Sequence, residues 1–455
     1  MRSVSNGAMY LALICAVATA APAQTTPAQT TDATPIKPED RGPLPAFAVV
    51  GPSRELKLGE FTWFRFGAQV QGWARIAQDR ILQTNGSDGG FAVDYYCRRC
   101  RLFTTGSIVK NVFFNILFEA SNLGKSDPTT GVKSFAAPNL LDAYAQVKFH
   151  DTFWLSGGNI LLPLTRNGLQ PTTTYLSIDT SNVAATPALQ GNTAVLRDLG
   201  FQANGFFASD HVEYRAGVFQ GTRQAAVTTG TGAAAVTTQT ASHNAPRFVA
   251  MLAANLWDTE TGYVNGGHYY GAKKVLGIMG NFDYQVLRTD SPPAVGTAKN
   301  AYKGVSGAVF INYPLSGTPN PRGGDELVGL LQVGYYDGGF TTSPAGAATN
   351  PGSYPNILKQ INYLAEAAYY NRDAKLSFFG KFEKRAYSDD YPTALKAVFP
   401  IPAQTWIAFG LKYYVAPANL LNLGLQYEHI TNDDAPGTQQ SGTHNITFQM
   451  QAILY

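Results

Sequence analysis

The predicted strands of this chain are joined by connections that alternate between long and short. Strand-like segments recur from about residue 60 to the end, and no amphipathic helical stretch interrupts them. Residues 78–94 and 163–195 form long connections, for example, whereas Lys110-Asn111 is a tight turn. Outer-membrane barrels have short periplasmic turns and longer outer loops, a bias that soluble sandwiches and propellers lack. The alternation predicts an all-β fold, a transmembrane antiparallel β-barrel of about 16 strands.

One connection breaks this alternation. Residues 257–274 form a long segment on the side where the other connections are short turns. The barrel prediction does not explain its length.

Apolar and polar side chains also alternate within the predicted strands. Strand side chains repeat every two residues, so one face can meet lipid while the other meets water. In the first and fourth strands the apolar series are Phe64, Phe66, Ala68, Val70 and Ile76, and then Leu141, Ala143, Ala145 and Val147. In the closing strand the series is Ile446, Phe448, Met450 and Ala452. The terminal Tyr455 does not share this phase, so either a bulge near Ala452 resets it or Tyr455 turns inward.

The N-terminus has the pattern of a secretory signal. Arg2 precedes an apolar run over residues 8–20, and Ala21-Pro-Ala23 fits a small-x-small cleavage site. We predict a signal peptide over residues 1–23, a disordered Pro/Thr-rich periplasmic leader over residues 24–58, and the barrel over residues 59–455. The predicted location is the outer membrane of a Gram-negative type of cell.

Composition excludes several classes of protein. Charged residues make up 14% of the chain and the mean hydropathy is −0.11, which is too polar for a helical membrane protein. The formal net charge of +3 does not indicate a nucleic-acid binder. Cys97 and Cys100 lie three residues apart in a predicted strand, where their side chains would point to opposite faces. We therefore expect free thiols.

Short motifs between residues 98 and 221 resemble the phosphate-selective porin O and P family. In order, they are Arg98-Arg99-Cys100-Arg101-Leu102, Leu141-Asp142-Ala143-Tyr144, Gly157-Gly158-Asn159, Leu162-Pro163-Leu164, Arg197-Asp198-Leu199-Gly200 and Gly217-Val218-Phe219-Gln220-Gly221. The resemblance implies a homotrimer of separate pores, a third loop (residues 163–195) folded into each lumen, and passive passage of small anions. Ile160 departs from the family pattern, which tends to carry a base at this position.

Strand parity predicts which charged side chains face the lumen. The bases are Arg65, Arg75, Arg99, Arg101, Lys148, Arg215, Lys273, Lys375, Lys381, Arg385 and Lys412. The acids are Glu119, Asp142, Glu213, Asp283, Glu326, Glu366, Glu383 and Glu428. Many bases therefore have an acid nearby. We select as candidates for anion selectivity Arg65, Arg75, Arg99, Arg101, Lys148, Arg166, Lys375, Lys381, Arg385 and Lys412, with Arg166 and Asp179 placed at a constriction by the long loop.

The sequence predicts a porin that passes small hydrophilic solutes passively, with a mild preference for phosphate-like anions. A sugar or organic-acid porin of the same architecture is the alternative, because the aromatics Trp73, Tyr144, Tyr336, Tyr370 and Trp406 have lumen parity. An outer-membrane enzyme is a weaker alternative, since the chain has no Gly-x-Ser-x-Gly and no His-Glu-x-x-His motif. No catalytic residue, metal site or cofactor is predicted, and the expected partners are outer-membrane lipid and small solutes.

Overall fold

The computed structural model describes residues 55–454 apart from residues 80–88, 128–130, 136, 192–195, 222–226, 230–235, 239–244, 287–300, 322, 339–356, 390–402, 417–418 and 434–439. The predicted signal peptide and most of the predicted leader lie outside the described residues, as does Tyr455. No helix in the described part of the chain is long and apolar enough to cross a membrane.

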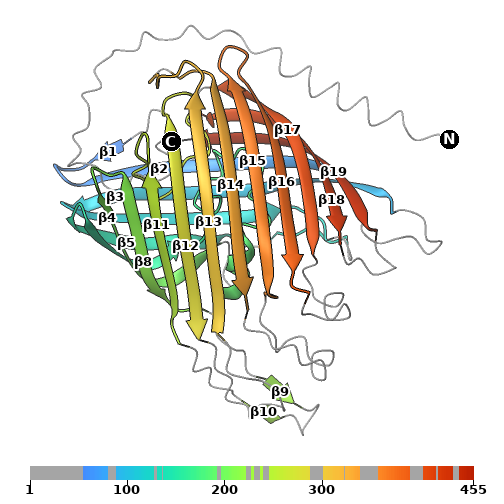
Figure 1. Ribbon diagram of the computed structural model, residues 1–455, viewed down its shortest axis with the longest axis horizontal. Coiled ribbons are helices and arrows are strands. Elements are labelled where there is room, and N and C mark those ends of the chain that lie inside the picture. Colours follow the sequence, from blue (N-terminus) through green and yellow to red (C-terminus); the bar gives the residue numbers. More distant parts are fainter. Residues whose placement is uncertain are drawn as a thin grey trace. The chain divides into compact units, whose positions relative to one another are not determined.

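Sixteen strands of the described residues form a closed antiparallel barrel. Figure 1 shows the strands side by side in its wall. They are β2 (Trp63–Gln78), β3 (Phe91–Val109), β4 (Val112–Leu123), β5 (Asn139–His150), β6 (Phe153–Leu161), β7 (Arg197–Phe207), β8 (Val212–Phe219), β11 (Arg247–Asn255), β12 (Val275–Val286), β13 (Ala301–Pro314), β14 (Glu326–Asp337), β15 (Gln360–Asn371), β16 (Leu376–Tyr387), β17 (Gln404–Ala416), β18 (Leu421–Asn432) and β19 (Gly442–Leu454). Each pairs with the next, and β19 pairs with β2. The prediction of a barrel of about sixteen strands is confirmed.

Three short strands lie outside this ring. β1 (Glu55–Lys57) pairs with the start of β2, so regular structure begins slightly before residue 59. β9 (Val227–Thr229) and β10 (Val236–Thr238) form a hairpin within the connection from β8 to β11.

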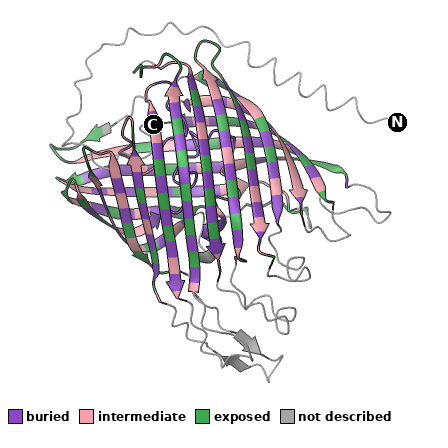
Figure 2. Cartoon of the chain, viewed as in Figure 1, coloured by how far each residue is buried: buried purple, intermediate pink, exposed green. Residues whose placement is uncertain are grey.

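Exposed and buried side chains alternate along the strands, which is visible as green and purple bands in Figure 2. In β19, Ile446 and Met450 are exposed, whereas Gln449 and Gln451 are buried inside the barrel. The ladder between β19 and β2 runs without a register shift as far as Leu454. The bulge considered near Ala452 is therefore absent, and the outward and inward phases of the closing strand are those predicted.

A bulge corrects the prediction for the fourth strand. On β4, the consecutive residues Leu117 and Phe118 pair with Asp142 and Leu140, which leaves Leu141 as an extra residue on β5. Leu141 is 3% exposed and packs with Phe103 and Leu117 inside the barrel. Its assignment to the lipid face was wrong, because the bulge resets the two-residue phase.

Gly158, in the Gly157-Gly158-Asn159 motif, occupies a position that excludes a side chain. Its φ is +132°, and a Cβ built there would lie 2.2 Å from the carbonyl oxygen of Ala143. We expect Gly158→Ala to destabilise the barrel by about 1–3 kcal/mol, the usual range for a strained backbone residue. Gly280→Ala is the matched control, because a Cβ there meets nothing within 4 Å. Thermal unfolding in detergent measures both, and equal midpoints would contradict this account.

Candidate pore constriction

A long connection folds into the barrel and forms the wall of the candidate constriction. This inner loop (residues 162–191) follows β6 and ends in the short 3-10 helix η3 (Thr186–Gly191). It is held by carboxylates of the opposite wall: Ser177 Oγ donates to Glu366 (2.8 Å) and Ser181 Oγ donates to Glu383 (2.8 Å). Lys412 reaches the loop as well, donating from Nζ to the carbonyl of Ser177 (2.8 Å) and to that of Tyr175. The inner loop is thus fixed by hydrogen bonds to strands β15 to β17.

The long connection on the short-turn side also folds inward. This inner turn (residues 256–274) joins β11 to β12, and its residues 265–271 are buried. It touches the inner loop directly: the N–H of Asn265 donates to the carbonyl of Leu169 (3.0 Å), and the N–H of Gly267 donates to Oγ1 of Thr174 (3.0 Å). The alternation of long and short connections did not explain the length of this segment. The structure shows that the inner turn forms part of the barrel interior.

A buried ion pair joins these two segments. Arg166 of the inner loop donates from Nη2 to Glu260 Oε1 (2.8 Å) and to the carbonyl of Gly266 (2.9 Å) of the inner turn. The two charged side chains are 2% and 5% exposed. The hydroxyl of Tyr269 also donates to Glu260. Burial raises the pKa of Tyr269, and the adjacent Glu260 raises it further, so the phenol stays a neutral donor.

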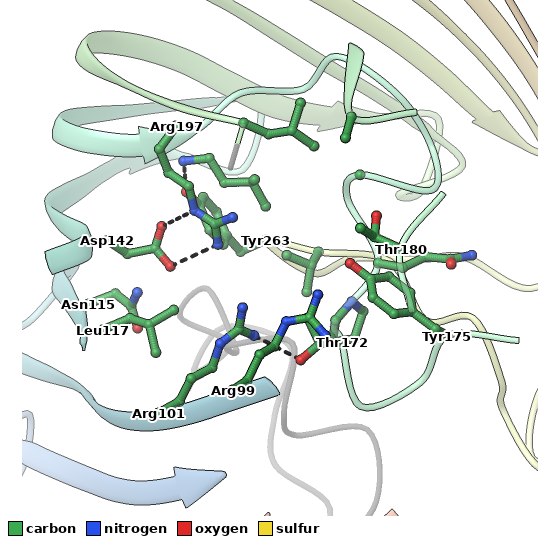
Figure 3. Close-up of a pocket in the computed structure, with 17 residues that line it drawn as sticks. Arg99, Arg101, Asn115, Leu117, Asp142, Thr172, Tyr175, Thr180, Arg197 and Tyr263 are labelled. Atoms are coloured by element: carbon green, nitrogen blue, oxygen red, sulfur yellow. Dashed lines mark hydrogen bonds and ion pairs between the residues drawn. The ribbon is translucent and has the colours of Figure 1, made fainter. Parts of the chain in front are cut away.

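Between the inner loop and β3 to β7 lies a cavity lined by three arginines (Figure 3). Arg197 binds Asp142 through Nε (3.0 Å) and Nη2 (3.4 Å). Arg101 forms an ion pair with Glu119 and donates to Oγ1 of Thr172 on the inner loop (2.8 Å). The remaining labelled residues in Figure 3 are Arg99, Asn115, Leu117, Tyr175, Thr180 and Tyr263. Arg197 and Arg101 thus each have a carboxylate partner.

Two consecutive arginines of β3 share one carboxylate of the inner loop. Arg98 Nε lies 3.0 Å from Asp179 Oδ2, and Arg99 Nη2 lies 2.6 Å from Asp179 Oδ1. Burial acts to raise the pKa of Asp179, but the two guanidiniums and the N–H of Thr180 outweigh it and hold the pKa below its usual range. One negative charge is thereby held against two positive charges.

Further cations lie near this pair. Burial lowers the pKa of Lys125, and the nearby charges of Arg75 and Arg98 lower it further. Asp94 and Asp179 are the acids that oppose this effect. We call Arg75, Arg98, Arg99 and Lys125 the basic cluster; its bases outnumber these two acids.

The prediction of free thiols was wrong. Cys97 and Cys100 form a disulfide, with Cα atoms 6.4 Å apart. On β2, the consecutive residues Gln71 and Gly72 pair with Arg99 and Cys97, so Arg98 is an extra residue on β3. This bulge brings both cysteines to one face, and it also brings Arg98 into the lumen, which strict alternation had not predicted.

Most of the predicted selectivity residues lie inside the barrel. Arg99, Arg101, Arg166, Lys381, Arg385 and Lys412 are buried, whereas Arg65, Arg75 and Lys148 are half-buried. Lys375 was assigned to the lumen wrongly: it is exposed in the turn before β16, with φ 55°, because that turn is longer than the two residues predicted. Strand parity did not select Arg98, Arg197 and Arg247, although all three point inward and bind acids.

Among the described residues, most lumen bases that contact an acid do so in pairs of one base with one acid. Further pairs include Arg215–Glu213, Arg247–Asp283 and Lys381–Glu383, with nitrogen–oxygen distances of 2.7, 2.5 and 2.6 Å. Arg247 also lies 3.9 Å from a second acid, Asp198. Such pairs carry little net charge, whereas the basic cluster holds four bases beside Asp94 and Asp179.

Comparison with known proteins identifies part of the chain. Residues 75–272 match the sequence model of the phosphate-selective porin O and P family. This stretch carries the phosphate-selective porin O and P signature. It covers somewhat less than half of the chain and contains β3 to β11, the inner loop and most of the inner turn. The resemblance inferred from the short motifs is confirmed over residues 75–272.

Solved structures share the porin barrel. Salmonella typhi OmpF in complex with daunomycin aligns with a TM-score of 0.54 at 11% identity, covering 88% of this chain and 100% of that chain. Pseudomonas putida OprB in a high-pH structure gives 0.53 at 11%, covering 86% and 94%. The outer membrane channel DcaP of Acinetobacter baumannii gives 0.51 at 12%, covering 88% and 99%. None of the curated proteins matches the chain. Family match and fold together support an outer-membrane porin channel, a non-enzymatic class.

Proposed function

We propose that this protein is an outer-membrane porin that passes small hydrophilic solutes passively and prefers anions mildly. The observation that carries the proposal is the basic cluster beside the inner loop, where Arg98 and Arg99 share the single carboxylate of Asp179. Fixed charges in a narrow channel with low-dielectric walls focus the field and bias which ions enter. The preference is mild because other lumen bases are neutralised by acids.

The same cluster suits more than one kind of anion. A guanidinium presents forked donors that match both phosphate and carboxylate oxygens. Organic acids are therefore a second class of solute for this channel. A sugar pore has weaker support, because Trp73 is engaged with its neighbours: its Nε1 donates to Gln449 (2.9 Å) and Arg98 lies 5.4 Å from its ring. Liposome swelling with sugars, organic acids and phosphate separates these solutes.

Homotrimer formation remains a proposal that rests on the resemblance. A trimer of separate pores would show as current steps in multiples of three and as three times the monomer mass by light scattering in detergent. A single-barrel mass would contradict it.

We expect the protein in a planar bilayer to give an anion-selective reversal potential in a salt gradient. The double variant Arg75→Gln and Lys125→Gln should move that potential toward zero, because it removes two charges of the basic cluster. Lys303→Gln is the control, since Lys303 is exposed on β13 and its removal changes the net charge but not the lumen. A cation-selective wild type would contradict the anion preference, and an absence of conductance steps would contradict the pore.

A further inference from the structure

The disulfide lies on the outer face of the barrel, opposite the basic cluster. On β3, Tyr95 and Leu102 flank the two cysteines and are 66% and 65% exposed, which marks the lipid-facing phase. Tyr96 and Arg99 are buried in the opposite phase. Cys97 and Cys100 share the outer phase on either side of the bulge, so neither sulfur touches the lumen or a solute.

The disulfide requires the bulge and, once formed, restricts its position. In a regular strand, residues three apart point to opposite faces, so these cysteines can be bridged only if one extra residue stands between them. The extra residue is Arg98, which has no partner on β2. Once formed, the bond keeps the bulge between the two cysteines, because a bulge before Cys97 or after Cys100 would place the two sulfurs on opposite faces.

The position of the bulge decides where two charges point. With the bulge at Arg98, this residue and Arg99 both face the lumen and both bind Asp179. If the bulge moved out of the segment between Cys97 and Cys100, one of these neighbouring arginines would turn toward lipid, because strand side chains alternate. The inner loop would then lose one of its two ion pairs at Asp179.

We propose that the Cys97–Cys100 disulfide is a positioning device that holds Arg98 and Arg99 together on Asp179, and that Arg98 is a specificity-determining residue of the channel. This inference rests on the proposed anion preference. The disulfide acts from the lipid side through the backbone of β3, and Arg98 transmits its effect to the lumen. Arg98 has two other contacts, Nη1 to Asn122 Oδ1 (3.3 Å) and the ring of Trp73, so the barrel can close without the disulfide while the bulge is less firmly held.

A double-mutant cycle tests this inference. Wild type, Arg98→Gln, the pair Cys97→Ser with Cys100→Ser, and the triple variant are compared by reversal potential and open-channel noise in planar bilayers. Removing the disulfide should shift the reversal potential toward zero, about as far as Arg98→Gln does, and should increase the noise of the open channel. In the Arg98→Gln background, its removal should add no further shift and no further noise.

Two outcomes overturn the inference. A serine pair with wild-type reversal potential and noise shows that the disulfide positions nothing. Equal shifts in both backgrounds show that it acts independently of Arg98, as a purely structural bond would. If the serine variant does not fold, tris(carboxyethyl)phosphine is added to the folded, oxidised channels of the wild type and of Arg98→Gln, and the same criteria apply.

Failure of the proposed function gives a different result. A wild type without anion selectivity contradicts the proposed function by its own reversal potential. The noise still tests the positioning: an increase that depends on Arg98 supports it, and an increase that does not depend on Arg98 contradicts it.

Discussion

Replacing Glu260 by glutamine should release the inner loop from the inner turn. Arg166 and Glu260 are 2% and 5% exposed, so the variant leaves the arginine charge buried without its partner. Breaking a buried ion pair by removing one partner costs about 3–5 kcal/mol. Because the barrel wall keeps its full ladder of strand pairs, we expect the chain to relieve this cost locally by moving the inner loop or the inner turn. Single-channel recording should show a larger conductance with frequent transitions between substates.

Two variants make this result specific. Asp151→Asn removes the carboxylate that lies 2.6 Å from Lys148, but that carboxylate is 74% exposed, and exposed pairs contribute only about 0–1 kcal/mol. It should leave the conductance unchanged. The double variant Arg166→Met with Glu260→Leu should be more stable than Glu260→Gln alone, because apolar side chains of similar volume leave no unpaired charge. A Glu260→Gln channel with wild-type conductance and thermal stability would show that the Arg166–Glu260 ion pair does not hold the inner loop to the inner turn.

The barrel itself was predictable because two solvents select its side chains. Lipid on one face and water on the other enforce a period of two, and a shift by one residue would expose the wrong face along a whole strand. That is why the phases of β2 and β19 agree with the sequence. Phe66 and Val70 were placed correctly on the lipid face from alternation alone, and they are 59% and 47% exposed.

The bulges were missed because alternation resumes after each of them. One extra residue at Leu141 or at Arg98 reverses which side chains beyond it face the lumen and which face lipid. A two-residue pattern does not indicate the position of such a residue. A signal was nevertheless present at Arg98-Arg99. Strict alternation would place one of two consecutive arginines in lipid, an unfavourable position for an arginine, and a bulge removes that conflict.

The interior of the barrel was predictable only in outline. Arg166 and Glu260 are 94 residues apart, and the segments that carry them have no regular period from which a contact could be inferred. The unusual length of the inner turn was the only visible sign that it does more than join two strands. Ion pairs such as Arg197–Asp142 likewise depend on how the inner loop and bulges orient the side chains.

Replacing Asp179 by asparagine should increase the anion selectivity of the channel, the opposite of the effect expected for Arg98→Gln. The variant keeps the shape of the side chain and leaves Arg98 and Arg99 without the carboxylate that they share. The reversal potential in a salt gradient should therefore move further in the anion-selective direction. We also expect more open-channel noise, because the inner loop loses both ion pairs at this position.

The lowered pKa of Asp179 leads to a prediction about pH. Its pKa is lowered in the folded protein, so the stability that it contributes is present above the unfolded value of about 3.9 and is lost only as the pH falls through the lower folded value. Between pH 7 and pH 5 the wild type should therefore not approach the reversal potential of Asp179→Asn. A wild type that reaches the Asp179→Asn value within that window would show that Asp179 becomes protonated there, and hence that two guanidiniums do not hold it. A constant difference between the two channels would support Asp179 as the charged anchor of the inner loop, with an excess of one positive charge from β3 beside it.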